Sequence, residues 1–309
     1  MALLFRSEGG RNEWWKAELG RRLPDVELRF WPDVGVPEDI EFALVWNMPH
    51  GQLATFPNLR VIFSLGAGVD HLYADPALPK GVPICRLVDK YLTQRMTEYV
   101  TLHVLRYHRR QPELEALQRE RKWDELWTPT AAERSVGIMG LGALGADAAR
   151  ALVALGFRVL GWSRTAKTLP GVESFHGSDG LGPFLAQSQI LVCLLPLTPR
   201  TENILDRRLF ALLPEGAVLI NVARGRHLVE ADLLAALDGG RLAYAALDVY
   251  RTEPLPPEHP FWRHPKIALS PHNASATDPR TTAEVVAENV RRCRAGEPLL
   301  YRVNEAEGY

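Results

Sequence analysis

The chain has 309 residues with 36 Lys and Arg against 37 Asp and Glu, so its formal net charge is −1. A charge this close to zero provides no field that would gather nucleic acid or an anionic membrane surface, and neither partner is expected. No apolar run approaches the roughly 20 residues that span a bilayer. The length exceeds that of one typical compact unit and predicts two domains, each with its own core.

The cysteines are odd in number, lie far apart and form no CxxC pair: they are Cys85, Cys193 and Cys293. This usage predicts neither a disulfide framework nor a zinc site, and it favours the reducing cytoplasm. No pair of His, Asp or Glu residues has ligand spacing on one element, so no metal is expected.

Short apolar runs separated by helical stretches fill the first hundred residues and predict parallel βαβ units. The candidate strands are residues 2–5, 26–30, 42–46, 60–64 and 83–86. A long amphipathic helix is predicted over residues 97–110, where apolar side chains recur at helical spacing. This helix could bridge two domains.

A second and clearer series of strands and helices begins at Arg134. The candidate strands are residues 135–139, 157–161, 190–194, 217–222, 243–249 and 267–270. Most of them are apolar throughout, which is typical of strands buried on both faces of a parallel sheet. Six such strands fit a doubly wound sheet. A last helix is predicted over residues 281–293, and the apolar segment 298–303 is expected to dock on the fold.

Residues 140–145 read GLGALG, directly follow the predicted strand 135–139 and open a helical run. In such a GxGxxG loop Gly140 permits a tight turn, Gly142 lets the backbone approach a pyrophosphate, and Gly145 lets helix pack on strand. Together with Ala143 and Leu144 they form the predicted cofactor loop. The alternative, a merely glycine-rich turn, does not explain the strand and helix on either side. The fold class predicted is α/β, with two doubly wound parallel-sheet domains, the larger a Rossmann dinucleotide-binding domain.

The second strand of a dinucleotide fold normally ends in an acidic residue that binds the adenosine ribose. In this chain Ser163 takes that position, Arg164 follows it and Lys167 lies just beyond. A carboxylate would repel a 2′-phosphate, whereas these three side chains could bind one. NADP(H) is therefore favoured and NAD(H) stays possible. The alternative is that Arg164 only stacks on adenine.

Ligands of an open parallel sheet bind outside the carboxyl ends of its strands. Six residues fall at or just after a predicted strand end: Gly140, Ser163, Pro196, Arg224, Asp248 and His272. Random placement would scatter them, so we expect them to converge on one edge of the sheet.

Three ionisable groups of this edge suit redox chemistry on a small oxo or hydroxy acid. Arg224 could hold a substrate carboxylate, and His272 could donate a proton to the carbonyl oxygen as hydride arrives from a nicotinamide. Glu253 could pair with the other imidazole nitrogen and set its tautomer. Asp248, at the end of a buried strand, needs a partner, and the nicotinamide carboxamide is a candidate. Taken singly, Arg224 could form a structural salt bridge, and His272 and Glu253 could be an ordinary structural histidine and a solvated loop acid.

The motifs taken together resemble the D-isomer-specific 2-hydroxyacid dehydrogenase family. The matching segments, in order and spacing, are residues 64–70, 140–145, 195–198, 221–225, 247–254 and 271–272. The resemblance implies that Arg224 binds substrate, that Glu253 tunes the histidine, and that His272 is the general acid or base. It also extends the expected cofactor contacts to Leu195, Pro196, Val222 and Ala223.

The resemblance further implies a discontinuous first domain. Residues 1–98 plus 284–309 would form the substrate domain, and residues 99–283 the NAD(P)-binding Rossmann domain. The backbone of Ala67 and Gly68 would face the substrate carboxylate. Within the family the chain is most similar to the glyoxylate and hydroxypyruvate reductases, and Trp46 looks like a substrate-pocket residue of that subgroup. Members are usually homodimers, and residues 123–127 are similar to part of that contact, although they could pack locally instead.

The function predicted is NADPH-dependent reduction of a small 2-oxo acid, glyoxylate or hydroxypyruvate, to the 2-hydroxy acid. One alternative keeps the fold but oxidises a larger D-2-hydroxy acid such as phosphoglycerate; the length and the apparent NADP site disfavour it. Another is a non-catalytic nucleotide-sensing corepressor or scaffold. The set Arg224, Glu253 and His272 disfavours that alternative, although a corepressor can retain such residues.

Overall fold

The computed structural model describes residues 1–305 and 307–308, and the chain divides into two compact units. One unit comprises Met1–Leu92 with Thr277–Tyr309, and the other comprises Thr93–Ala276. The domain boundaries implied by the family resemblance, 98/99 and 283/284, lie a few residues later in the chain than these. Residues 306 and 309, which the expected domain 284–309 includes, lie outside the described residues.

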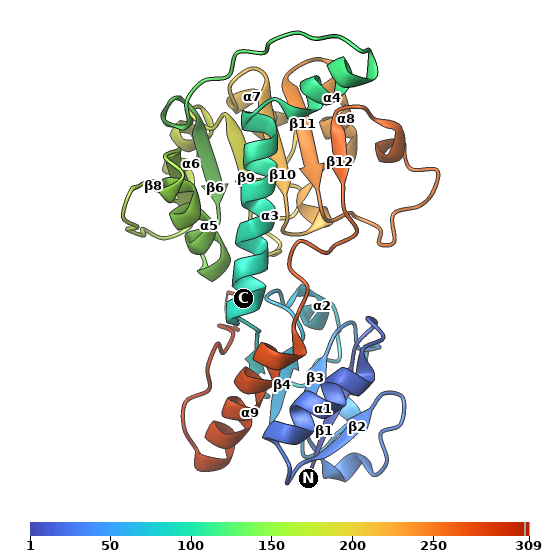
Figure 1. Ribbon diagram of the computed structural model, residues 1–309. Helices are drawn as coiled ribbons and strands as arrows, with labels where there is room; N and C mark the ends of the chain where they lie inside the picture. The colour runs from blue at the N-terminus through green and yellow to red at the C-terminus, as the bar shows by residue number, and fades with distance from the viewer. Residues whose placement is uncertain (306, 309) are drawn as a thin grey trace. The chain divides into compact units, whose positions relative to one another are not determined.

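Both units are built on parallel sheets, which confirms the predicted α/β class (Figure 1). The first unit contains β1 (Ala2–Arg6), β2 (Glu27–Phe30), β3 (Ile40–Val45), β4 (Val61–Ser64) and β5 (Ile84–Cys85), with α1 (Asn12–Arg22), α2 (Asp70–Tyr73), α9 (Pro279–Ala295) and the first turn of α3 (Lys90–His108). The second contains β6 (Ser135–Met139), β7 (Arg158–Ser163), β8 (Val172–His176), β9 (Ile190–Cys193), β10 (Ala217–Asn221), β11 (Leu242–Leu247) and β12 (Ile267–Leu269), with the rest of α3, α4 (Gln111–Arg119), α5 (Ala143–Ala154), α6 (Gly177–Leu185), α7 (Arg207–Leu212) and α8 (Glu230–Asp238). In the described part of the chain, every helix is too short or too polar to cross a membrane.

The sheet of the first unit has the strand order β2-β1-β3-β4-β5. Helices α1 and α9 cover one face, where Phe5 packs on Trp15 with ring centroids 5.1 Å apart and Val286 joins the same cluster. The predicted docking of the terminal segment occurs at the β5 edge, where the Val303 N–H donates to the carbonyl of Ile84 at 2.8 Å. Because α9 completes this core, a segment from the far end of the chain stabilises the first unit.

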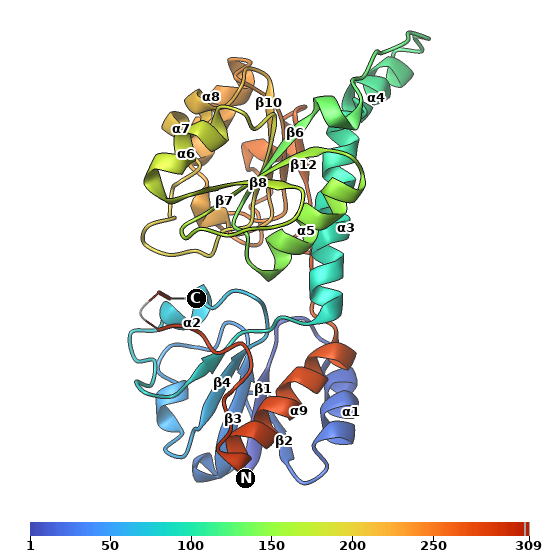
Figure 2. The ribbon, with the colours of Figure 1, turned by 90° about the vertical axis from the view of Figure 1, so that its left-hand side faces the viewer.

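The sheet of the second unit has the order β12-β11-β10-β9-β6-β7-β8. The chain therefore enters at an inner strand, β6, builds outward to β8, and then returns to β9 on the other side of β6. This reversal makes the carboxyl ends of β6 and β9 the switch point where dinucleotides bind in doubly wound folds. Helices α3 and α5 cover one face, and α6, α7 and α8 cover the other (Figure 2).

The seven-stranded sheet has one strand more than the six expected from the sequence. The missing strand is β8 (Val172–His176), whose residues are mostly exposed or only half-buried because it lies at the edge. The inner strands β6, β9 and β10 are buried along their whole length. A search for apolar runs therefore finds the inner strands and overlooks the solvated edge strand.

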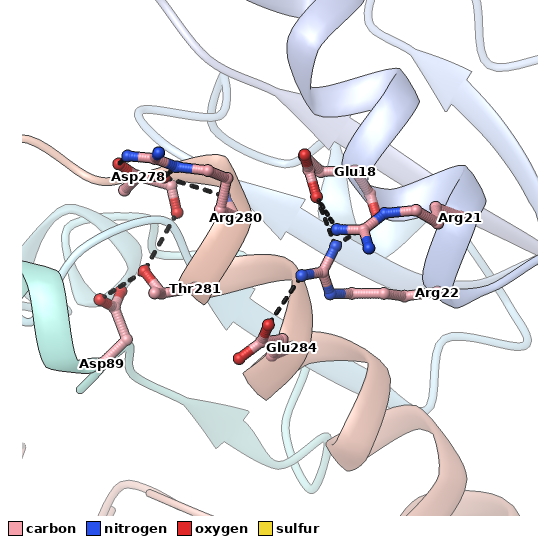
Figure 3. A network of polar contacts seen from close by, with 8 residues as sticks. All are labelled: Glu18, Arg21, Arg22, Asp89, Asp278, Arg280, Thr281 and Glu284. Carbon is pink, nitrogen blue, oxygen red and sulfur yellow. Dashed lines mark hydrogen bonds and ion pairs between the residues drawn. The ribbon is translucent and has the colours of Figure 1, made fainter.

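A polar network inside the first unit joins the start of α3 to the start of α9 (Figure 3). The Asp89 carboxylate accepts two backbone N–H groups in the first turn of α3 and the hydroxyls of Thr281 and Thr282 at 2.8 and 2.9 Å. Asp278 caps α9 and also binds the guanidinium of Arg280 at 2.7 Å. The two segments that lead to the other unit are thus held together within the first unit.

His103 on α3 is a buried histidine outside any chemistry expected from the sequence. Its ring lies between those of Tyr99 and Tyr107, at centroid distances of 4.4 and 6.3 Å. Its Nδ1 has no hydrogen-bond partner among the described residues. Burial, aided by the charge of Arg106, lowers the pKa of His103 to about 4. The folded protein therefore holds this ring neutral at pH values where the unfolded chain protonates it.

We expect this histidine to make the second unit less stable in acid. Well above pH 6.5 the ring is neutral in both the folded and the unfolded protein, and it does not affect the free energy of unfolding. As the pH falls from 6.5 to 4, mainly the unfolded chain takes up the proton, which lowers that free energy. The fully developed difference is worth about 3 kcal/mol. The His103→Leu variant should lose less of its free energy of unfolding between pH 7 and pH 4 than the wild type, measured by urea unfolding. Equal losses in the two proteins would contradict this origin.

Candidate functional site

Three neighbouring strands of the second unit carry the predicted catalytic residues at their carboxyl ends. Strand β10 lies next to β11, which lies next to β12. Arg224 follows β10, Glu253 lies in the loop after β11, and His272 follows β12. Because the strands are parallel and adjacent, their carboxyl ends share one edge, as the sequence predicted.

His272 and Glu253 are in direct contact. The imidazole Nδ1 lies 2.7 Å from Oε2 of the Glu253 carboxylate. The other carboxylate oxygen, Oε1, accepts the backbone N–H of Tyr250 at 2.9 Å, so the turn that carries Glu253 also orients it. About a third of each side chain is exposed. Because the carboxylate contacts Nδ1, we expect a substrate to meet the ring at Nε2.

The charge state of Glu253 suits this arrangement. Burial alone would raise the pKa of this carboxyl. The hydrogen bonds from His272 and the Tyr250 backbone, together with the positive charges of His272 and Arg224, outweigh burial and place the pKa below its usual value. Glu253 is therefore an anion at neutral pH and can accept a hydrogen bond from Nδ1 of His272.

Arg224 is half-buried and is held from two sides. Its backbone N–H points at Nδ1 of the fully buried His227 at 3.2 Å, and the other ring nitrogen of His227 lies 3.3 Å from the Pro196 carbonyl. The next residue, Gly225, packs directly on the Glu253 loop: a Cβ there would lie 1.8 Å from the carbonyl carbon of Tyr250. Only glycine permits this approach, so the loops that carry Arg224 and Glu253 are packed backbone to backbone.

Asp248 is almost fully buried at the end of β11, and the chain itself supplies its partners. Its carboxylate accepts the Ser270 hydroxyl at 2.6 Å and the backbone N–H groups of Asn273 and Ala274, each at 2.9 Å. Burial raises the pKa of this carboxyl, and these hydrogen bonds oppose the rise. Contact of Asp248 with a nicotinamide carboxamide stays a prediction.

The glycines of the loop after β6 meet the requirements of a phosphate loop. Gly140 has φ of 103°, and a Cβ on it would lie 2.6 Å from the carbonyl oxygen of Leu194. A Cβ on Gly145 would lie 1.9 Å from the carbonyl oxygen of Gly140, so only glycine lets α5 approach the turn. Gly142 caps α5, whose first turn contains Ala143 and Leu144. The backbone N–H groups of such a first turn are suited to bind a pyrophosphate.

The residues expected to distinguish the two dinucleotides lie beside this loop. Ser163 ends β7, and its hydroxyl donates to the Thr165 carbonyl at 2.7 Å. Lys167 donates from Nζ to the carbonyl of Leu141 at 2.7 Å, which places its charge against the phosphate loop. Arg164 is exposed between them. No carboxylate occupies the end of β7, and two cations flank that position.

The remaining expected cofactor residues follow β9 and β10, at the same carboxyl edge of the sheet. Leu195, Val222 and Ala223 are buried, and Pro196 is half-buried. The Pro196 carbonyl also accepts the Thr201 hydroxyl at 2.7 Å. This part of the edge therefore has an apolar wall, formed by Leu195, Pro196, Val222 and Ala223.

The residues expected to face substrate in the first unit form a separate group at the ends of β3 and β4. Trp46 packs on the 66–68 turn, since a Cβ on Gly66 would lie 2.9 Å from its ring. Within that turn, which contains Ala67, the Gly68 carbonyl accepts the Ser64 hydroxyl at 2.7 Å. The imidazole of His71 lies 3.0 Å from Ser64 Oγ and packs on Trp46 with ring centroids 4.3 Å apart.

Two histidines that contact expected site residues were not predicted from the sequence: His71, against Trp46 in the first unit, and His227, against Arg224 in the second. Each links two loops that are distant in sequence, and neither belongs to a recognisable motif. His227 follows Arg224 at a spacing that places it in the same short turn, and this spacing was the only available signal. Among the described residues no group of three or more His, Cys, Asp or Glu side chains could hold a metal ion.

Comparisons with known proteins show what the chain is similar to. Residues 101–274 match the family model of the D-isomer specific 2-hydroxyacid dehydrogenase NAD binding domain. The glyoxylate/hydroxypyruvate reductase A of Serratia proteamaculans is 43% identical over 314 residues, which span 100% of both chains.

Two solved structures are similar along the whole chain. A D-isomer specific 2-hydroxyacid dehydrogenase from Xanthobacter autotrophicus Py2, in complex with NADPH and MES, has a TM-score of 0.96 and 46% identity and covers 100% of this chain and 99% of its own. An NADPH-dependent glyoxylate/hydroxypyruvate reductase from Sinorhizobium meliloti, in complex with NADP and sulfate, has a TM-score of 0.94 and 40% identity and covers 100% of both chains.

Two glycine substitutions separate folding from binding in the phosphate loop. We expect Gly145→Ala to destabilise the protein by about 2 kcal/mol, because the new Cβ collides with the Gly140 backbone. Gly142→Ala meets no atom within 4 Å and should keep the free energy of unfolding within about 0.5 kcal/mol. It should still weaken dinucleotide binding, because its Cβ blocks close approach of the pyrophosphate. Unfolding and fluorescence titration measure both effects, and an undisturbed fold in Gly145→Ala would contradict the packing argument.

Proposed function

The chain belongs to the D-isomer specific 2-hydroxyacid dehydrogenases, and we propose that it reduces small 2-oxo acids, with glyoxylate and hydroxypyruvate as the leading substrates, using NADPH. The observation that carries the proposal is the 2.7 Å contact between His272 and Glu253 at the strand edge that Arg224 shares. Among the relatives named above, the Xanthobacter structure contains NADPH and the Sinorhizobium reductase is NADPH-dependent. The Serratia and Sinorhizobium proteins are named for glyoxylate and hydroxypyruvate.

The residues of the second unit fit NADPH. The glycines of the 140–145 loop leave space for a pyrophosphate, the buried Leu195, Val222 and Ala223 offer an apolar wall, and Arg164 and Lys167 suit a 2′-phosphate. When bound, NADPH supplies the hydride that the substrate carbonyl carbon accepts. Oxidation of the carbinol with NADP⁺ is the reverse of the same step.

The protein groups supply binding and the proton. Arg224 binds the substrate carboxylate through parallel hydrogen bonds and holds the carbonyl in place. Protonated His272 donates from Nε2 to the carbonyl oxygen as negative charge develops there. Glu253 keeps the imidazole in the required orientation through its contact with Nδ1. Trp46 and the backbone of Ala67 and Gly68 are proposed to contribute the substrate contacts of the first unit.

We further propose that the protein is a homodimer in the cytoplasm. Trp123 and Trp127 expose 98% and 76% of their surface, which is unusual for tryptophan in a monomer. They lie in an extended segment after α4, in the region that resembles the dimer contact of the family. The three cysteines are unpaired, and two of them are buried, which suits a reducing compartment.

The activity can be tested by comparing two histidine variants, one within the candidate site and one outside it. NADPH consumption with glyoxylate, hydroxypyruvate, pyruvate and phenylpyruvate should be fastest with the first two. His272→Ala should lower kcat by about 10²–10⁴-fold. His264 lies before the start of β12, whereas His272 follows its end, and Nε2 of His264 is 3.3 Å from Oδ1 of Asp238. His264 thus also pairs with a carboxylate but lies away from the strand ends that form the site, so His264→Ala should keep kcat within about twofold. Absence of turnover with every short 2-oxo acid would refute the proposal, as would equal effects of the two substitutions.

Reductive turnover should depend on pH through the His272–Glu253 pair. The proton donor must be charged, so kcat/KM for reduction should fall as the pH rises through the titration of this pair. Glu253→Gln replaces the anion of this pair with a neutral amide and should move this fall to lower pH. Rate profiles of both proteins measure the shift. Superimposable profiles would show that Glu253 does not tune the donor.

A further inference from the structure

The loop that carries His272 adopts a backbone conformation that a non-glycine residue seldom takes. His272 has φ of 51°, in the left-handed region. Its N–H donates to the Asp248 carbonyl at 2.8 Å, and the next two N–H groups, of Asn273 and Ala274, donate to the Asp248 carboxylate. One residue thus holds three successive N–H groups, and the orientation of Asp248 determines where the imidazole lies.

The carboxylate of Asp248 is oriented in turn by two hydroxyls. The Ser270 hydroxyl donates to Oδ1 of Asp248 at 2.6 Å. The oxygen of Ser270 lies 2.5 Å from the hydroxyl oxygen of Tyr99. Because the Ser270 proton is committed to the carboxylate, the Tyr99 hydroxyl is the donor in this second contact. The bonds therefore run in one direction, from Tyr99 through Ser270 to Asp248.

Tyr99 is well placed to anchor this chain of hydrogen bonds. It lies on α3, and its ring packs on His103 and on the core beneath the helix. One turn earlier on the same helix, Arg95 donates to the Ala276 carbonyl at 2.6 Å. Two side chains of α3 thus hold the two ends of the 270–276 segment. Burial raises the pKa of Tyr99 to about 12, so the phenol keeps its proton at neutral pH.

We propose that Tyr99 is a positioning residue for His272, acting through Ser270 and Asp248. The proposal rests on the proposed function, in which His272 is the proton donor. Proton transfer requires the ring nitrogen at hydrogen-bonding distance from the carbonyl oxygen, and a small displacement of the loop is enough to slow it. Tyr99 does not touch the reacting atoms in this account; it supports the loop that does.

The test compares two tyrosines of the same helix. Tyr99→Phe and Tyr107→Phe each remove one phenol hydroxyl and keep the ring, and Tyr107 donates to the Ala245 carbonyl at 3.0 Å, within the sheet. Amide hydrogen exchange followed by mass spectrometry should show faster exchange across residues 270–276 in Tyr99→Phe, with no change there in Tyr107→Phe. This readout needs no turnover, so it tests the proposal even if the proposed function fails.

Kinetics then ask whether the loop matters for the reaction. With NADPH and glyoxylate, Tyr99→Phe should lower kcat about tenfold, while KM for both substrates stays within about twofold. Tyr107→Phe should keep kcat within about twofold. A Tyr99→Phe/Ser270→Ala double variant should lose no more activity than Ser270→Ala alone, because both changes break the same chain of bonds.

Three results would overturn the proposal: unchanged exchange in the 270–276 segment of Tyr99→Phe, equal kcat in the two tyrosine variants, or multiplied losses in the double variant. If the wild type reduces no 2-oxo acid while exchange increases as expected, the proposed function fails and the positioning of the loop stands.

Discussion

The hydrogen bond between Nδ1 of His272 and the Glu253 carboxylate is the contact on which the candidate site depends. It joins the loops after two neighbouring strands, and at 2.7 Å it fixes both side chains at once. The carboxylate is already oriented by the Tyr250 N–H, and the same turn is pressed against Gly225, next to Arg224. The side chain proposed to bind substrate and the proposed proton donor are therefore both positioned by contacts that meet at the Glu253 loop.

The structure around His272 contains two features that are unfavourable for stability, a strained backbone and a buried carboxylate. The left-handed backbone of His272 is unfavourable for a side chain with a Cβ, by about 1–3 kcal/mol. Three hydrogen bonds to Asp248 offset the strain, and Asp248 must be buried in order to make them. Strain and a buried carboxylate are unfavourable for stability in isolation. Such locally unfavourable features are typical of functional sites, where side chains must be held in a particular geometry.

Much of this could be predicted from the sequence because it is written in local patterns. The glycines of the 140–145 loop and the apolar inner strands each follow from a short segment, and the parallel sheet then places the strand ends together. The start of α3 also had a local signal that the periodicity missed. Asp89, which caps the helix, lies eight residues before position 97, where the apolar pattern begins, and it marks the earlier start at Lys90.

Other features depend on contacts between distant segments and had no such signal. Strand β8 is polar because it lies at an edge, which is known only once the order of strands is known. The link from Tyr99 to Ser270 joins residues that are 171 positions apart. Asp248 was expected to need a partner, and the sequence did not show that the loop after the next strand supplies backbone N–H groups to it. Sequence patterns located the groups, and tertiary packing determined what each one contacts.

The most direct test of the central claim is a double-mutant cycle on kcat/KM with Glu253→Gln, His272→Asn and the combination, measured with NADPH and glyoxylate. If Glu253 acts through His272, the double variant will be no slower than His272→Asn alone, because the carboxylate has no imidazole left to hold. If the two losses multiply instead, the residues act independently and the contact between them is not the basis of catalysis.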